Sequence, residues 1–297
     1  MIKEGKDILS PYGDLDLLYY YSLVARKLGN FLKGKELATK IHLSGKMPKL
    51  LKRGSQLQPI YIPDLLKVDE DLLKLRVGHH LKEVREKLTY PQIVLWEYFF
   101  PRRMIDLFYA CNREHPGKPL ERIFIDIDKG QYVSSETAQE VCRVLLETIL
   151  WDKKFNTLAH FKPRILWTGN SFHLYLLLNT SLKPSFYDNY LSYRDPQINT
   201  KNFISIWAAE VSKQTGIHTE AGHEKSQEHI ILDSSGTPSG KLARAPFSLH
   251  IPPSGTYDGI ALPLSQKDLS KKTLVKRFRK LTPEDVVNNL DKFAKLL

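Results

Sequence analysis

The sequence predicts an α+β fold, with a mixed or antiparallel sheet flanked by helices and a helix-rich N-terminal module. Three observations support this prediction. Apolar residues recur at steps of three and four in the first third of the chain, as they do on amphipathic helices. From residue 122 they alternate with a period of two, which is typical of strands. The helices that follow lie between strands without a regular β-α-β order, which favours α+β over a parallel α/β sheet.

The N-terminal module, residues 1–115, is basic and mostly helical in its pattern. Residues 15–40 and 64–110 have the helical period, and we expect helices over most of both ranges. Between them, residues 43–65 are basic and interrupted by Gly and Pro, which predicts a loop with one short strand. A turn-rich linker at 112–121 leads into the next part of the chain.

The core, residues 116–266, begins with a strand at 122–128. A helix follows at 134–150, and either Ser134 or Ser135 is a suitable N-cap because a short hydroxyl side chain accepts from the exposed backbone N–H groups. The core therefore opens with a strand and a helix.

The middle of the core contains a predicted hairpin and a second helix. The two strands within 164–178 meet at Gly169 and Asn170, a pair of residues typical of tight hairpin turns. Residues 202–216 have a helical pattern that ends at Gly216, a residue that commonly closes helices.

A further strand is predicted at 228–234, followed by a loop at 236–250 that ends in a short extended segment. The last part, residues 267–297, is a basic segment with a C-terminal helix. Thr282 as N-cap and Pro283 at the first helical position predict where that helix begins.

The charge of the chain is unusual for its otherwise ordinary composition. Lys and Arg number 44 against 33 Asp and Glu, so the formal net charge is +11. Such an excess favours polyanionic partners, with nucleic acid first and an anionic membrane surface second. A generally basic protein without such a partner is the alternative.

Cysteine content and apolar stretches indicate the cellular setting. Cys111 and Cys142 lie in unrelated contexts, which excludes a disulfide framework or a Cys-x-x-Cys zinc element. The N-terminus has no apolar core typical of a signal peptide, and the apolar stretch at 17–25 is far shorter than the ~20 residues of a membrane helix. We therefore expect a cytoplasmic protein without a membrane segment and without structural zinc.

Two carboxylates stand one residue apart in the first core strand. Because alternate side chains of a strand share a face, Asp126 and Asp128 point together, opposite the isoleucines around them. Neighbouring carboxylates raise each other's pKa unless a cation neutralises them, and a divalent metal is one such cation. A solvated strand face or a salt-bridged pair are the alternatives, which this pattern alone leaves open.

The following strands add candidates of the same kind. Ser171, His173 and Tyr175 share the polar face of the second hairpin strand, although a lone His on a strand is more often structural. Gly169 in the preceding turn would let backbone N–H groups approach a phosphate. Asp233, at the end of the strand 228–234, supplies a third carboxylate in the same kind of position.

Cations and hydroxyls follow the third carboxylate. Lys241, Arg244, Ser248 and His250 come next in the chain, and such groups beside three carboxylates suit a nucleoside triphosphate with its metals. For Lys241 and Arg244 a solvated surface loop is the alternative.

Taken in order, Asp-x-Asp at 126–128, Ser-x-His at 171–173 and hydrophobic-Asp at 232–233 resemble the three motifs of the archaeo-eukaryotic primase superfamily. The segment LARAPFSLH at 242–250 is similar to one that follows the third motif in archaeal primases. Residues 15–45 are more faintly similar to the opening of the polymerase domains of end-joining ligases.

The resemblance implies a primase-polymerase core and a metal-dependent, template-directed nucleotidyltransferase that makes or extends primers from NTPs or dNTPs. Asp126, Asp128 and Asp233 would hold two Mg²⁺ or Mn²⁺ ions ~3.5–4 Å apart, as in two-metal phosphoryl transfer. His173 and His250 would be direct phosphate ligands. The predicted nucleotide-binding residues are Ser171, His173, Lys241, Arg244, Ser248 and His250.

One departure from archaeal primases bears on the role. They usually carry a zinc knuckle, which two scattered cysteines cannot supply, and His218, His223 and His229 match no known metal spacing. This favours a stand-alone primase-polymerase or repair polymerase. A partner subunit or a replication or repair factor is still possible. The rival functions are a non-catalytic nucleic-acid-binding subunit and a phosphotransferase acting on a small substrate.

Two basic stretches could hold a DNA template or primer. Residues 44–54 and 270–280 are dense in Lys and Arg, which suits phosphate contacts that carry no sequence information, although either could be a solvated face. The predicted nucleic-acid-binding residues are Lys49, Lys52, Arg53, Lys276, Arg277 and Arg279.

Overall fold

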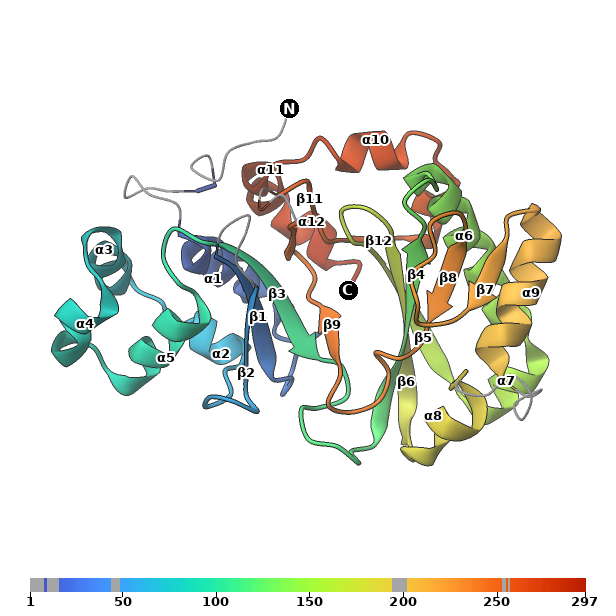
Figure 1. Ribbon diagram of the computed structural model, residues 1–297, viewed down its shortest axis with the longest axis horizontal. Coiled ribbons are helices and arrows are strands. Elements are labelled where there is room, and N and C mark those ends of the chain that lie inside the picture. Colours follow the sequence, from blue (N-terminus) through green and yellow to red (C-terminus); the bar gives the residue numbers. More distant parts are fainter. Residues whose placement is uncertain (1–7, 10–15, 44–48, 194–201, 253–254, 256) are drawn as a thin grey trace.

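The computed structural model describes residues 8–9, 16–43, 49–193, 202–252, 255 and 257–297 (Figure 1). Its helices and 3₁₀ turns are α1 Leu17–Leu28, α2 Ile62–Leu65, α3 Glu70–Gly78, α4 Leu81–Val84, η2 Arg85–Lys87, α5 Tyr90–Tyr98, α6 Ser135–Trp151, α7 Lys153–Leu158, α8 Ser185–Tyr190, α9 Phe203–Thr215, η3 Gln266–Ser270, α10 Leu274–Phe278, α11 Pro283–Asn288 and α12 Leu290–Ala294. Its strands are β1 Leu37–His42, β2 Leu50–Arg53, β3 Met104–Ala110, β4 Leu120–Lys129, β5 Phe161–Trp167, β6 Phe172–Leu182, β7 Thr219–Ala221, β8 Ile230–Asp233, β9 Leu242–Arg244, β10 Leu249–His250, β11 Gly259–Ile260 and β12 Leu262–Leu264.

These elements form two main sheets flanked by helices, which confirms the predicted α+β class (Figure 1). The smaller main sheet has the order β2-β1-β3-β9 and is antiparallel throughout. The larger has the order β12-β5-β6-β4-β8-β7, and it is mixed because β7 runs parallel to β8. A separate pair, β10-β11, completes the described strands. Within the described part of the chain, no helix has both the length and the apolar character to span a membrane.

The N-terminal module contains more strand than predicted. The first helix ends at Leu28, and residues 37–42 form β1 instead of continuing it; likewise the helices of 64–110 end at Tyr98, and residues 104–110 form β3. Both strands are buried on both faces, so their apolar residues do not alternate with polar ones. A strand of that kind cannot be distinguished from a buried helix by periodicity. The helical expectation was wrong for these two segments.

The core elements follow the prediction closely. The Ser134 hydroxyl accepts from Thr137 N and so caps α6, while Gly169 in the hairpin turn has φ +102°. α9 ends at Gly216, whose φ of +71° is the left-handed conformation that glycine adopts without strain. Thr282 caps the last helical segment, which is interrupted after Asn288 and so forms two short helices, α11 and α12.

The larger sheet separates apolar and polar faces at β4. Ile123, Ile125 and Ile127 are fully buried on one face, while Asp126 and Asp128 lie on the other. The long helix α6 packs against β4, β6 and α9, so its buried stripe closes the apolar side of this sheet (Figure 1). The polar side is left to face the N-terminal module.

The two sheets are joined by backbone pairing and by buried hydrogen bonds. β9, from the predicted core, pairs with β3 of the N-terminal module. On α1, the Tyr20 hydroxyl donates to the Phe247 carbonyl and the Tyr21 hydroxyl donates to the Ile105 carbonyl. Side-chain hydrogen bonds also fix the predicted linker at 112–121. The predicted boundary between the N-terminal module and the core, at 115/116, stays a prediction; buried apolar residues on both sides of it belong to one continuous hydrophobic core.

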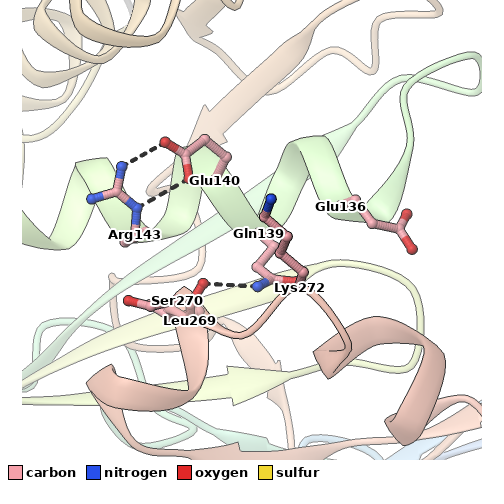
Figure 2. A pocket seen from close by; sticks show the side chains of 7 residues that line it. All are labelled: Glu136, Gln139, Glu140, Arg143, Leu269, Ser270 and Lys272. Atoms are coloured by element: carbon pink, nitrogen blue, oxygen red, sulfur yellow. Dashed lines mark hydrogen bonds and ion pairs between the residues drawn. The ribbon is translucent and has the colours of Figure 1, made fainter.

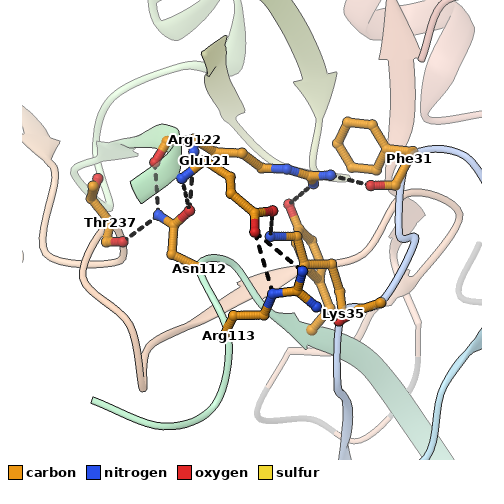
Figure 3. A network of polar contacts seen from close by, with 9 residues as sticks. Phe31, Lys35, Asn112, Arg113, Glu121, Arg122 and Thr237 are labelled. Carbon is orange, nitrogen blue, oxygen red and sulfur yellow. Dashed lines mark hydrogen bonds and ion pairs between the residues drawn. The ribbon is translucent and has the colours of Figure 1, made fainter. Parts of the chain in front are cut away.

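Asn112 is the centre of these hydrogen bonds (Figure 3). Its side-chain oxygen accepts from the backbone N–H groups of Glu121 and Arg122, and its amide donates to the Arg122 and Thr237 carbonyls. The Thr237 hydroxyl in turn bridges the backbone N–H and carbonyl of Phe124. The segment that follows β8 is therefore fixed beside β4, where the polar face carries its carboxylates.

Candidate active site

Three side chains form a row across the polar face of the larger sheet. Asp126 on β4 pairs in register with His173 on β6 and with Asp233 on β8. Directly opposite residues of antiparallel strands have their Cβ atoms about 4.5–5.5 Å apart and point to the same face. The His173 Nε2 atom lies 3.4 Å from Asp126 Oδ1. The first and third sequence motifs therefore meet through adjacent strands, with the second on the other side.

Asp128 lies two residues further along β4 on the same face, opposite Ile231. Burial and the neighbouring charge of Asp126 together raise the pKa of Asp128 to about 6, although Lys225, with its Nζ atom 3.8 Å away, opposes the shift. For Asp126, burial alone would raise the pKa, but the His173 imidazole lowers it below its usual value. Of this pair, Asp128 is thus the carboxylate whose negative charge is less well stabilised by the groups around it.

The carboxylates are each paired with a nitrogen of the protein. Asp126 contacts His173, Asp128 contacts Lys225, and His223 Nδ1 lies 2.9 Å from Asp233 Oδ2. In this arrangement no group of three or more His, Cys, Asp or Glu side chains among the described residues converges tightly enough to hold a metal ion. The donor set itself fits Mg²⁺ or Mn²⁺, because both prefer carboxylate oxygens and three such groups share one face.

A cavity of about 330 Å³ opens between the two sheets at this point. The larger sheet supplies its acidic and histidine side, and β9 with the Lys241 segment supplies its basic side. Its lining residues are Phe108, Phe124, Asp126, His173, His223, Asp233, Ser235, Gly236, Lys241, Leu242, Ala243 and Arg244.

Arg244 is the most firmly held cation of this cavity. One guanidinium nitrogen donates to the Leu249 carbonyl at 2.6 Å and lies 3.5 Å from Asp106 Oδ2. The guanidinium carbon lies 5.0 Å from the centre of the Phe108 ring, within the range of a cation–π contact. An arginine fixed in this way is suited to an anionic ligand because little side-chain freedom is left to lose on binding.

Three of the six predicted nucleotide-binding residues do not line this cavity. Ser171 is buried and donates to the Ile127 carbonyl. Ser248 is fully buried; its hydroxyl accepts from Leu107 N and donates to the Leu249 carbonyl. Both hydroxyls therefore bind backbone, and a phosphate-binding role for them stays a prediction without a contact that favours it.

His250 lies beside the hairpin turn rather than in the cavity. Its Nδ1 atom is 2.5 Å from Asp258 Oδ1. A Cβ atom on Gly169 would lie only 2.6 Å from the His250 Cβ, so glycine is required at that position of the turn. His173, Lys241 and Arg244 are the predicted residues that the structure brings together with the carboxylates.

Other cavity residues were not predicted. Phe124 shares the strand face of Asp126, so alternation could have identified it. Phe108 lies on β3, which the sequence had suggested was helical. His223 stood in a polar loop whose spacing matched no metal site. The remaining histidines of that loop, His218 and His229, stack at 4.5 Å between ring centroids and both contact Glu220.

A larger pocket, of about 600 Å³, lies between α6 and η3 and is unrelated to the carboxylates (Figure 2). There the Arg143 guanidinium pairs with Glu140, and the Gln139 amide donates to the Leu269 carbonyl. Arg143 is also paired with Glu147, so this arginine is held by two glutamates of its own helix.

The predicted nucleic-acid-binding residues differ in their environments, and residues 44–48 of the first basic stretch lie outside the described residues. Arg53 pairs with Glu114 at 2.7 Å and donates to the Gly240 carbonyl. Arg279 donates to the Ser135 hydroxyl, and Arg277 lies 3.8 Å from Asp268. Lys49 and Lys276 are exposed, and Lys52 is half-buried.

Comparison with known proteins identifies the fold. Neither a family model nor a curated protein sequence matches the chain. Among solved structures, the polymerase domain of ligase D from Mycobacterium tuberculosis, determined in complex with DNA, is similar with a TM-score of 0.59 and 16% sequence identity. The match covers 99% of this chain and 95% of that one. At this identity the likeness shows the fold alone, which is shared with that polymerase domain.

Proposed function

We propose that this protein is a metal-dependent, template-directed nucleotidyltransferase that uses nucleoside triphosphates, a primase or primase-polymerase in activity. The observation that carries the proposal is the placement of Asp126, Asp128 and Asp233 on one face of two paired strands, in a fold shared with a polymerase domain. A purely structural sheet gains nothing from three carboxylates side by side, because burying them near one another is unfavourable.

Asp126, Asp128 and Asp233 would hold the divalent cations, Mg²⁺ or Mn²⁺, which supply charge neutralisation for the attacking hydroxyl and the departing pyrophosphate. His223 and Lys225 now contact two of these carboxylates from the loop between β7 and β8. Both side chains are largely exposed, at 64% and 80%, so they can turn away without disturbing the core.

The opposite side of the cavity would bind the triphosphate. Arg244 and Lys241 supply positive charge there, and His173 lines the same cavity beside Asp126. Phosphoryl transfer depends mostly on positioning and charge stabilisation, and a pre-oriented arginine provides both.

Nucleic acid is the proposed second ligand. The net charge of +11 favours a polyanion, and the similar ligase D domain was determined with DNA bound. Template binding also distinguishes this proposal from a phosphotransferase that acts on a small substrate.

The test is incorporation of labelled NTPs or dNTPs by the purified protein, with Mg²⁺ or Mn²⁺, with and without a single-stranded template and a primer. We expect incorporation that requires template and metal. Incorporation that ignores the template would support the small-substrate enzyme. If oligonucleotide binding occurs without any incorporation in either metal, the alternative of a non-catalytic binding subunit holds instead. The observation that favours this alternative is that each of the three carboxylates already contacts a nitrogen atom of the protein, from His173, His223 or Lys225.

A further inference from the structure

Exposed apolar side chains gather where α6, α7 and α9 meet (Figure 1). Trp151, the last residue of α6, is 81% exposed, although tryptophan is highly buried on average. In the described part of the chain seven large apolar residues are exposed, and four of them belong to these helices: Leu150, Trp151, Leu158 and Ile206. Apolar residues that are exposed as a cluster mark interaction surfaces, whereas single ones do not.

Buried contacts hold the three helices together at this point. Asp152, between α6 and α7, accepts a hydrogen bond from Phe155 N with one carboxylate oxygen. Its other carboxylate oxygen accepts from the Trp207 indole of α9 at 2.8 Å. The Phe155 and Trp207 rings meet edge to face, with 4.8 Å between their centroids. The exposed surface above these contacts is therefore preformed, which lowers the entropic cost of binding a ligand.

The exposed charge of this surface is positive. Lys153 and Lys154 are exposed on α7, which contains no acidic residue, and neither forms a salt bridge within the described residues. The nearest acidic residues in the chain are already engaged, Asp152 in the contacts above and Glu147 with Arg143 at 2.9 Å. We call this surface the Trp151 patch and define it by Leu150, Trp151, Lys153, Lys154, Leu158 and Ile206.

The chemistry of the Trp151 patch favours a protein segment over other occupants. Bases of nucleic acid stack on aromatic rings, but the aliphatic side chains of Leu150, Leu158 and Ile206 have no counterpart in a nucleic acid. A second copy of this chain, related by a twofold axis, would bring the lysines of α7 against each other. Helices that lie on anionic membranes carry a long apolar face, whereas α7 has six residues. An acidic segment with an apolar side chain matches both the charge and the apolar character of the patch.

The Trp151 patch lies far from the carboxylates of the sheet. α6 begins just beyond the end of β4, where Asp128 lies, and runs back along the apolar face of the larger sheet (Figure 1). Its 17 residues span roughly 25 Å, so Trp151 lies toward the opposite end of that sheet. An occupant of the patch therefore leaves the cavity and the polar face of the sheet open.

We propose that the Trp151 patch docks an acidic segment of a partner protein. An apolar side chain of that segment packs against the Trp151 indole and the neighbouring leucines, and its carboxylates lie beside Lys153 and Lys154. This inference goes beyond the proposed function and does not depend on it, because the patch shares no residue with the carboxylate cavity. The partner would be held to this protein without blocking access to the cavity.

The test selects ligands for the immobilised full chain from a display library of random twelve-residue peptides. We expect the enriched peptides to combine two or more Asp or Glu with an aromatic or aliphatic residue. A labelled synthetic copy of the best peptide is then titrated by fluorescence anisotropy. Trp151→Ser should weaken its binding by about tenfold or more, since a tryptophan at the centre of an interface is commonly a hot spot. Lys153→Glu with Lys154→Glu should weaken binding as strongly, and most of its salt dependence should disappear.

Tryptophan fluorescence reports the same event without a label. The chain has four tryptophans, and the other three, Trp96, Trp167 and Trp207, are at most 2% exposed. Acrylamide should therefore quench Trp151 far more than the others, and the bound peptide should protect it from quenching. Trp151→Ser should lose the quenchable part of the signal, while thermal unfolding checks that the variant remains folded.

A matched control reverses two charges elsewhere. Lys82→Glu with Lys87→Glu changes exposed residues of α4 and η2, at the opposite end of the molecule from α7 (Figure 1). Because this variant has the same net charge as the double lysine variant of α7, it separates a local contact from a general effect of charge. It should bind the peptide within about twofold of the wild type.

The proposal is overturned if the selection yields no binder, if the enriched peptides lack acidic residues, or if Trp151→Ser binds them as tightly as the wild type. It is also overturned if the control loses as much affinity as the double lysine variant of α7. Three further results would assign the patch to another occupant. These are protection of Trp151 by a single-stranded oligonucleotide, protection by vesicles that contain phosphatidylserine, and self-association of the wild type that Trp151→Ser abolishes. Nucleotide incorporation is not a readout of these experiments, so failure of the proposed function leaves their outcome unchanged.

Discussion

Asp126 of β4 and Asp233 of β8 stand directly opposite each other in an antiparallel ladder, although 107 residues separate them in the chain. The ladder ends there, because the chain turns away after Asp233 and the Thr237 side chain takes over the bonding to Phe124. The pairing that holds the sheet together is thus the same pairing that places the two carboxylates side by side. The predictions below follow from this relationship and from the cavity beside it.

Asp128→Asn should stabilise the metal-free protein at neutral pH. The pKa of Asp128 is raised from 3.8 to about 6 in the fold, so the folded state binds more protons between those values. Stability therefore falls as pH rises through that window and stays lower above it. The asparagine variant lacks this loss and should gain about 1–3 kcal/mol at pH 7.5.

The measurement is urea unfolding of wild type and Asp128→Asn in EDTA at pH 7.5 and pH 4. The difference in free energy of unfolding should shrink at the lower pH, where Asp128 is mostly protonated in the folded wild type. Added Mn²⁺ should stabilise the wild type more than the variant. An equal difference at both pH values would contradict a raised pKa for Asp128 in the folded state.

Arg244→Ala should weaken nucleotide binding more than the chemical step. Its guanidinium is oriented by the Leu249 carbonyl, Asp106 and Phe108, and it faces the cavity. We expect KM for the nucleotide to rise about tenfold or more. Arg244→Lys should restore only part of this loss, because lysine keeps the charge without the planar contacts.

Asp106→Asn tests whether Asp106 helps to orient the Arg244 guanidinium. Asp106 is buried at 2% exposure, so it can affect the ligand only through Arg244 and its surroundings. Steady-state kinetics should show a raised KM with kcat within about threefold of the wild type. A fall in kcat alone would mean that Arg244 is positioned by other contacts.

Gly236→Ala should close part of the cavity. A Cβ atom at this position would overlap the Phe124 ring, which forms the neighbouring wall. The ring would have to move toward the space that the ligand needs, so nucleotide affinity should fall by about tenfold. Gly29→Ala is the matched control, because nothing lies within 4 Å of its added Cβ. Isothermal titration with a non-hydrolysable triphosphate compares the two, and equal affinities would place the ligand elsewhere.

The carboxylate row could be predicted from the sequence because it depends on local rules. Alternation along β4 placed Asp126 and Asp128 on one face, and Asp233 stood at the end of a recognisable strand. These local rules could not predict which strands pair with one another in the sheets. The buried strands β1 and β3 have no polar alternation, so Phe108 and Asp106 were missed as parts of the site.

The burial of individual polar side chains also could not be predicted from the sequence. Ser171 and Ser248 have the residue type and spacing of phosphate ligands, yet each hydroxyl binds a backbone group of a distant segment, near Ile127 and Leu107. The role of Asn112 depends on four hydrogen bonds that exist only when β4 and the segment after β8 are assembled. Such contacts are long-range and leave no periodic signal.

The most direct test of the central claim is template-dependent primer extension by Asp233→Asn beside the control Asp188→Asn, with Mn²⁺ in excess. Asp188 is an exposed residue of α8, and its substitution should leave the rate unchanged. Asp233→Asn keeps the side-chain shape and should fold and bind the primer-template like the wild type, while its extension rate falls at least a thousandfold. Extension by Asp233→Asn at a rate close to that of the control would contradict the claim that the paired carboxylates of β4 and β8 act together in catalysis.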